Sequence, residues 1–225
     1  MKKIYSFLLL TAMVSCRPLL HVTTTLNAKQ LWQQHKRIAI IPFRVTSRDN
    51  EWLKKGELML EMQNMKKLSF SIQNNMYRVL QSQINLSNLS VDIMPIDSTT
   101  QALAQFGITY NNLPIQNLNK LCSVLHVDAV IAGEVEFSNP LRVGSSTYGV
   151  SEVEKAAVWM QIYDKNKNTP IWVFKEANAA RGYNRFYKRA NYINGTNQEY
   201  LIAYMFDKAM KILPYVIKSP IKRYY

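Results

Sequence analysis

Two pairs of closely spaced carboxylates are the most direct indication of chemistry in this sequence. Glu134 and Glu136 are two residues apart, and Glu152 and Glu154 repeat that spacing. Residues two apart share one face of a β-strand, so each pair would present both carboxylates on the same side. Paired carboxylates can act as general acid and general base on a glycosidic bond. Solvated charges near a strand edge explain the same spacing, and we favour that interpretation.

The histidines and cysteines do not form a catalytic or metal-binding pattern. His21, His35 and His126 are scattered along the chain, and the two cysteines, Cys16 and Cys122, are far apart. A zinc site needs three or four ligands in a recognisable spacing, and nucleophilic hydrolases carry motifs that are absent from this sequence. We therefore expect no metal, no cofactor and no enzymatic activity.

A basic and aromatic segment between residues 181 and 192 is the strongest candidate for binding a partner. Its cationic and aromatic side chains are interleaved, and the candidate contact residues are Arg181, Tyr183, Arg185, Phe186, Tyr187, Lys188 and Arg189. Arginine and tyrosine are enriched at the centres of protein interfaces, and clustered cations attract acidic polymers and lipid head groups. A solvated loop whose tyrosines cover a sheet remains the alternative.

The first sixteen residues, MKKIYSFLLLTAMVSC, have the pattern of an export signal. Lys2 and Lys3 precede an apolar run that is shorter than the ~20 residues a spanning helix needs. Met13-Val14-Ser15-Cys16 resembles the bacterial lipobox, in which the cysteine is acylated and becomes the N-terminus. That resemblance implies removal of residues 1–15 and a lipid anchor on Cys16. An ordinary signal peptide cut near Cys16 is the alternative.

The predicted compartment narrows the choice of partner. An exported protein does not meet nucleic acid, so we expect a membrane contact through Cys16 together with an envelope protein or an acidic envelope polymer. In enteric lipoproteins an aspartate after the cysteine retains the protein in the inner membrane. By that analogy Arg17 implies an outer-membrane lipoprotein facing the periplasm.

Length and composition indicate one folded domain. The chain has 225 residues, of which 48% are hydrophobic, and a net charge of +13. This is a globular composition with enough length for a sizeable core, and its charge suits an acidic partner. We predict a signal peptide at 1–15, an anchor and tether at 16–36 with a short helix near 28–35, a single domain at 37–217, and a basic tail at 218–225.

Hydrophobic periodicity predicts an α/β fold. The expected strands are 37–43, 91–96, 127–133, 157–163 and 171–174, and the expected helices are 57–84, 97–106, 115–126 and 196–213. In helix 57–84 the apolar residues at helical spacing predict one buried face, made of Leu58, Met62, Met65, Leu68, Ile72, Met76, Val79 and Leu80. The order predicts a mixed, mostly parallel sheet flanked by helices, with an antiparallel hairpin in the C-terminal half.

Two strand motifs carry a family resemblance. Arg37-Ile-Ala-Ile-Ile-Pro-Phe43 and Val127-Asp-Ala-Val-Ile-Ala-Gly133, together with the long helix, are similar to a group of bacterial envelope lipoproteins. The group includes the curli-secretion lipoprotein, the lipoprotein activators of penicillin-binding proteins and small uncharacterised relatives. The resemblance covers residues 36–215 and implies an accessory, scaffolding or pore-forming role.

The resulting functional expectation is a non-enzymatic, membrane-anchored periplasmic lipoprotein. It would serve cell-wall synthesis or secretion machinery as an accessory or scaffolding module. One alternative is a homo-oligomeric outer-membrane secretion channel, which would need membrane hairpins near 137–156 and 177–198. Charges such as Glu154 and Arg185 in those segments oppose a lipid-facing strand. A glycan-active enzyme that uses the paired carboxylates is the other alternative.

Overall fold

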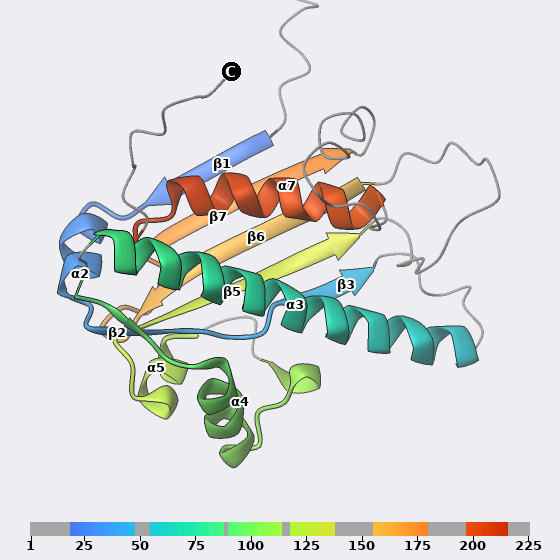
Figure 1. Cartoon of the computed structure of the whole chain (residues 1–225), viewed down its shortest axis with the longest axis horizontal. Helices are drawn as coiled ribbons and strands as arrows, with labels where there is room; N and C mark the ends of the chain where they lie inside the picture. The colour runs from blue at the N-terminus through green and yellow to red at the C-terminus, as the bar shows by residue number, and fades with distance from the viewer. Residues whose placement is uncertain are drawn as a thin grey trace, which may run out of the picture.

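A seven-stranded mixed sheet forms the centre of the protein. The structure is a computed structural model, and it describes residues 19–47, 55–87, 90–113, 118–137, 155–179 and 197–215. The strands lie in the order β1–β7–β6–β5–β2–β4, with β3 also paired to β5 (Figure 1). Their bounds are β1 Leu19–Thr24, β2 Arg37–Ile40, β3 Arg44–Ser47, β4 Asp92–Ile93, β5 Ala129–Phe137, β6 Lys155–Asp164 and β7 Trp172–Ala179.

The predicted fold class, a mixed α/β sheet flanked by helices with a C-terminal hairpin, is confirmed. β2 runs parallel to β4 and β5, and β3 runs parallel to β5. β1, β5, β6 and β7 form antiparallel pairs, and β6–β7 is the predicted hairpin. The antiparallel ladders are the longer ones, because β5, β6 and β7 have eight to ten residues whereas β2 and β4 have four and two. The sheet is therefore mostly antiparallel, whereas the sequence predicted a mostly parallel one.

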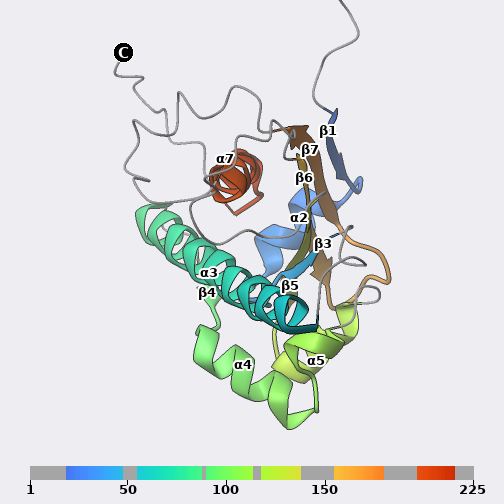
Figure 2. The same ribbon diagram turned by 90° about the vertical axis from the view of Figure 1, so that its right-hand side faces the viewer.

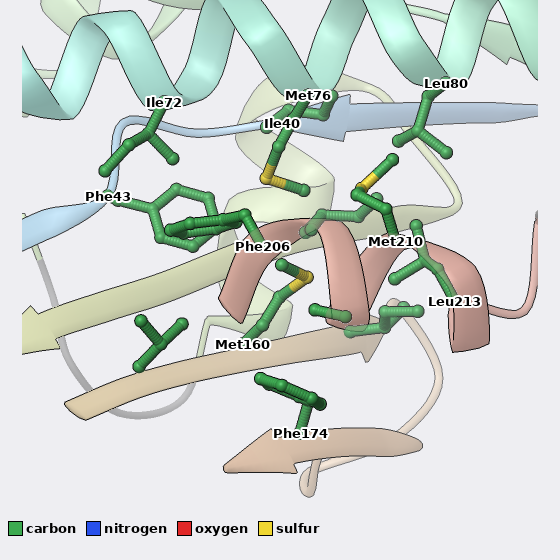
Figure 3. Packing of buried hydrophobic residues seen from close by; sticks show 14 of the residues in the cluster. Ile40, Phe43, Ile72, Met76, Leu80, Met160, Phe174, Phe206, Met210 and Leu213 are labelled. Atoms are coloured by element: carbon green, nitrogen blue, oxygen red, sulfur yellow. The ribbon is translucent and has the colours of Figure 1, made fainter. Parts of the chain in front are cut away.

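Two helices cover one face of the sheet. Helix α3 (Lys55–Ser87) and helix α7 (Asn197–Ile212) lie on the same side, as Figure 2 shows. Between them and the sheet lies the larger core, in which Phe43 and Phe206 meet edge to face with ring centroids 5.1 Å apart (Figure 3). Residues from three elements interlock there: Ile72, Met76 and Leu80 from α3, Met210 and Leu213 from the α7 region, and Met160 and Phe174 from the sheet.

The opposite face is covered only at one end. Helices α4 (Ile96–Gln105) and α5 (Asn119–Leu125), joined in part by the short 3-10 turn η1 (Tyr110–Asn112), pack there in a second, smaller core (Figure 2). That core places Leu103 and Leu121 against Val130 and Ala132 of β5. Over the rest of this face, no helix among the described residues lies on the sheet.

A proline interrupts the strand that borders β5. Ile40 pairs with Ile131 and Arg44 pairs with Glu134, so three residues of the β2–β3 strand stand opposite two of β5. This is a β-bulge, and Pro42 lies in it because proline has no N–H for the ladder. Gly133 lies opposite the bulge. A Cβ added to Gly133 would overlap the ring of Phe43 and lie 2.5 Å from the Trp159 carbonyl oxygen.

The segment predicted as a tether contains part of the fold. Residues Leu19–Thr24 form edge strand β1, which pairs with β7, and α2 (Ala28–Gln34) follows it. The short helix was predicted, but the strand was not, because its partner lies about 150 residues further along the chain. Residues 1–18, including Cys16, lie outside the described residues.

Several helix details differ from the sequence prediction. In α3, Met65 is buried as expected, but Met62 and Val79 are 52% and 44% exposed because the helix turns them away from the sheet. Helix α4 begins at Ile96, one residue before the predicted start, and it follows Pro95. Gly107 has the positive φ expected for the residue after a helix.

A buried polar network ties the two ends of the domain together. His35 Nε2 lies 2.8 Å from Asp164 Oδ2, and His35 Nδ1 lies 2.5 Å from the Tyr215 hydroxyl. Burial, with Asp164 nearby, raises the pKa of Tyr215 well above its ordinary value, so this hydroxyl keeps its proton and can donate to Nδ1. The network connects the C-terminal end of α2, the end of β6 and the segment after α7.

Candidate functional site on the open sheet face

A transverse row of polar and aromatic side chains crosses the uncovered part of the sheet. The strand register places Arg44 of β3 beside Glu134 of β5, Glu134 beside Trp159 of β6, and Trp159 beside Lys175 of β7. His21 of β1 extends the row beyond Lys175. Directly paired residues point to the same face, so the five side chains share one face.

The burial pattern identifies that face as the open one. Val135 and Phe137 alternate with Glu134 and Glu136 along β5; the two apolar side chains are buried in the larger core, and the two carboxylates are only half-buried. Lys175 and His21 are exposed. The open face thus combines cations, carboxylates and an indole, which are the side chains that bind ligands through charge, hydrogen bonds and flat apolar contact.

A pocket of about 220 Å³ lies where the open face meets the layer of α4 and α5. The lining residues are Ile41, Pro42, Arg44, Leu113, Leu118, Ala132, Gly133, Glu134, Trp159, Gln161 and Lys175. The bulge forms one wall, the leucines that flank the smaller core form another, and Trp159 and Gln161 contribute from β6. The pocket is therefore shaped by the strand interruption and by the edge of the helical layer.

The ion pair between Arg44 and Glu134 in the pocket is weak. Arg44 Nε lies 3.9 Å from Glu134 Oε1, with the two side chains 42% and 29% exposed. A pair at that distance and exposure contributes little, which leaves both groups available to a ligand. Gln161 is better fixed, because its amide oxygen accepts a 2.7 Å hydrogen bond from the Tyr163 hydroxyl. Its NH₂ group then remains as a donor.

The wall beside Arg44 is held by a tyrosine. The Tyr110 hydroxyl accepts a hydrogen bond from the Val45 backbone N–H at 3.2 Å and lies 3.3 Å from the Val45 carbonyl oxygen. Burial raises the pKa of Tyr110, while the bond to Val45 and the charge of Arg44 oppose that rise. This contact fixes η1 against β3, and so it positions Leu113 at the pocket.

The sequence prediction identified part of this site. Glu134 and Glu136 share one face, as their spacing predicted, and Glu134 lines the pocket. Trp159 lines the pocket as well, whereas Trp172 is a core residue at 1% exposure. No sequence pattern indicated Arg44 or Lys175, since only the strand register brings them to the same row.

The candidate residues of the basic aromatic segment stay predictions. Arg181, Tyr183, Arg185, Phe186, Tyr187, Lys188 and Arg189 lie outside the described residues, as do Glu152, Glu154 and most of the two segments considered for membrane hairpins.

Metal-binding clusters and membrane-spanning helices are both missing from the described part of the chain. It contains no group of three His, Cys, Asp or Glu side chains placed to hold a metal ion. None of its helices combines the length and the apolar character needed to cross a membrane. Cys122 is buried behind β5, and burial raises the pKa of its thiol to about 12.

Comparison with known proteins gives structural neighbours only. No family model and no curated protein matches the chain. The LpoB C-terminal domain from Salmonella enterica is 13% identical, with a TM-score of 0.34, and the match covers 64% of this chain and 82% of that one. A lipoprotein from Neisseria meningitidis is 13% identical, with a TM-score of 0.41, and the match covers 79% of this chain and 99% of that one.

A third neighbour is the PelC dodecamer from Paraburkholderia phytofirmans, which is 10% identical, with a TM-score of 0.38. The match covers 90% of this chain and 100% of that one. The group of envelope lipoproteins that the sequence resembles is thus represented among the solved structures. At these identities the likeness concerns the course of the backbone.

Proposed function

We propose that the protein is a non-enzymatic lipoprotein of the bacterial periplasm, anchored in the outer membrane by acylated Cys16. It acts there as an accessory module that binds an envelope partner in cell-wall synthesis or secretion. The observation that supports the proposal is the pairing of β1 with β7, because the start of β1 and the end of β7 lie at the same end of the sheet. These are the strand ends that are next in the chain to the predicted anchor and to the basic aromatic segment.

The anchor joins the sheet almost directly. Strand β1 begins at Leu19, three residues after Cys16. Three extended residues span at most about 10 Å, so an acylated Cys16 would hold the Leu19 end of the sheet close to the bilayer. Because β1 and α2 lie within the tether predicted at residues 16–36, an acylated Cys16 would restrict the orientation of the domain on the membrane.

The basic aromatic segment joins the sheet at the same end. Leu19 pairs with Ala177, and β7 ends at Ala179, two residues before the segment begins at Arg181. The segment therefore follows directly from the end of the sheet that an acylated Cys16 would hold near the bilayer. Cations beside a bilayer are attracted to acidic head groups and to acidic partners, which supports a role for this segment in binding at the membrane surface.

A membrane-anchored module increases the local concentration of its partner without catalysis. A tether converts the second binding event into an intramolecular one, with an effective concentration set by the length of the tether. The row of Arg44, Glu134, Trp159 and Lys175 suits such a role, because arginine and tryptophan on an uncovered surface are typical of binding centres.

The test compares three forms of the full-length protein by membrane fractionation and by affinity capture from solubilised envelopes. We expect wild type to fractionate with the outer membrane and to capture a specific envelope protein. Cys16→Ser should appear in the periplasmic fraction. A variant with glutamine at Arg181, Arg185, Lys188 and Arg189 should stay in the membrane and lose the captured protein.

Two results would contradict the proposal. Retention of Cys16→Ser in the outer membrane would show that acylation is not the anchor. Recovery of only the protein itself, as a large assembly that does not respond to the four charges, would favour the secretion-channel alternative. A variant with glutamine at Lys29, Lys66, Lys67 and Lys120, which are exposed, removes the same number of charges and controls for a general effect of lost charge.

A further inference from the structure

The pocket on the open sheet face has the shape of a site for one ring of a larger ligand. Its volume, about 220 Å³, is below the ~300–1,000 Å³ typical of sites that enclose a drug-sized molecule. It opens onto a sheet face that continues past Thr46 and Lys175. A polymer could therefore place one unit in the pocket and extend along the face.

The strands that carry Glu134, Trp159 and Lys175 are paired on both sides, whereas β3 is paired with β5 alone. On the outer side of β3 the Tyr110 hydroxyl already occupies the Val45 N–H and carbonyl oxygen, so the main chain at the pocket offers little to an added peptide strand. Strand β5 lies between β6 on one side and β2 and β3 on the other. Strand β6 lies between β5 and β7, and strand β7 lies between β6 and β1. Addition of a strand needs a free edge with unpaired N–H and C=O groups. A ligand here has to be recognised by side chains instead.

Those side chains suit a sugar ring. The indole of Trp159 is half-buried in the pocket wall and offers a flat apolar surface. Glu134 supplies a carboxylate acceptor, and Gln161 supplies an amide donor whose orientation is fixed by Tyr163. An apolar ring face with hydroxyl groups around its rim matches this combination.

The charges favour an acidic sugar over a neutral one. Arg44 and Lys175 are the two cations of the lining, against the single carboxylate of Glu134, and His21 follows Lys175 in the row. These cations reach the pocket from the two ends of the row, with Glu134 and Trp159 between them. Both attract anionic groups, and the arginine fork can bind both oxygens of a carboxylate. The net charge of +13 on the chain acts in the same direction at longer range.

We propose that this pocket binds a carboxylated pyranose ring of an acidic polysaccharide. Trp159 stacks on the ring, Arg44 binds its carboxylate, Lys175 adds attraction for the acidic chain from the other side of Trp159, and Glu134 and Gln161 hydrogen-bond its hydroxyl groups. The binding needs neither the lipid anchor nor a protein partner, so it goes beyond the proposed function and can fail or succeed independently of it.

Isothermal titration of the detergent-solubilised full-length protein tests the proposal with four probes. Tetragalacturonate and the disaccharide of N-acetylglucosamine and N-acetylmuramic acid are the acidic saccharides. Maltotetraose is the neutral saccharide, and tetraglutamate is an acidic peptide without a sugar ring. We expect at least one acidic saccharide to bind about tenfold more tightly than maltotetraose and tetraglutamate, which corresponds to one strong charge-assisted contact.

Variants assign the binding to the pocket. Trp159→Ala should weaken binding of the acidic saccharide at least about tenfold, whereas Trp159→Phe, which keeps a flat ring and protects the fold, should weaken it less. Replacing Arg44 and Lys175 by glutamine should abolish the preference for acidic over neutral saccharide. The Lys66→Gln, Lys67→Gln variant removes the same charge from α3 and should bind like wild type.

Three results would overturn the proposal. The first is binding of neither acidic saccharide. The second is tetraglutamate binding as tightly as the better saccharide, since charge alone would then be recognised. The third is an equal loss of affinity in the Lys66→Gln, Lys67→Gln control. Circular dichroism of each variant separates a lost site from a lost fold.

Discussion

Replacing Asp128 by asparagine should destabilise the protein, because this carboxylate joins three parts of the fold. Its Oδ2 accepts hydrogen bonds from the backbone N–H groups of Lys36 at 2.7 Å and Arg37 at 3.0 Å. Its Oδ1 accepts one from Lys165 Nζ at 2.7 Å. Asp128 therefore connects the start of β2, the segment before β5 and the turn between β6 and β7.

The pKa of Asp128 gives the size and the sign of the effect. Burial alone would raise this pKa, but the hydrogen bonds from Lys165, Lys36 and Arg37 outweigh it and lower the pKa from 3.8 to about 2. Such a shift corresponds to about 2 kcal/mol by linkage. The Lys165 side chain is 49% exposed, so solvent screens part of that interaction, and we expect about 1–2 kcal/mol.

The direction of the pH dependence follows from the lowered pKa. Because the folded protein holds the carboxylate in its charged form, this stabilisation is present above the unfolded-state pKa of 3.8. It is lost as the pH falls towards 2, where the folded protein also takes up the proton. The asparagine side chain of the variant cannot become charged, so the free-energy difference between wild type and Asp128→Asn should shrink between pH 4 and pH 2.

Urea unfolding at several pH values, followed by circular dichroism, measures this difference. The control is Asp92→Asn, whose carboxylate is 70% exposed and lies 3.5 Å from Arg37 Nε; it should change stability by less than about 0.5 kcal/mol. The reasoning would be refuted by a loss in Asp128→Asn no larger than that of the control. A difference from wild type that stays constant down to pH 2 would refute it equally.

Three further predictions concern buried positions. Gly133→Ala should lower the free energy of unfolding by about 1–3 kcal/mol in urea titrations, because the added methyl group overlaps Phe43; an unchanged midpoint would contradict this. His35→Ala should lower it by about 1–3 kcal/mol, since it leaves the buried Tyr215 hydroxyl unpaired; a thermal midpoint equal to that of wild type would count against the network. The Cys122 thiol, whose pKa is about 12, should resist alkylation at pH 8 until the protein is unfolded, as measured by mass spectrometry.

The sequence predicted the elements whose signals are local. Residues 129–132 form a continuous apolar run, and the observed strand β5 begins at its first residue, Ala129. Helix α3 follows from apolar residues at helical spacing, and the hairpin from two strands around a polar turn. Each of these signals lies within one stretch of chain, which is why the sequence contains it. Strand β1 has no such signal, because its residues show no clear alternation and its partner β7 is distant in the chain.

The residues of the open face could likewise be predicted only where their signal lies within one stretch of chain. Glu134 and Glu136 were predictable as a pair, because alternation along one strand is a local property. Arg44 and Lys175 are 131 residues apart in the chain and share a row only through the register of four strands. That register cannot be predicted from residue spacing. In addition, the sequence contains 28 lysines and arginines, so nothing distinguishes these two cations from the others.

The shape of the pocket and the packing of the larger core both depend on the β-bulge at Pro42. The bulge at Pro42 turns Phe43 into the larger core, where its ring meets Phe206, and Gly133 makes room for that ring. The same bulge brings Ile41 and Pro42 to the open face as one wall of the pocket. A side chain at position 133 would also press on the Trp159 carbonyl. A change that damages packing at the bulge should therefore shift the indole of the pocket as well, so stability and ligand binding are expected to fall together in Gly133 variants, whereas Asp128→Asn should leave binding intact.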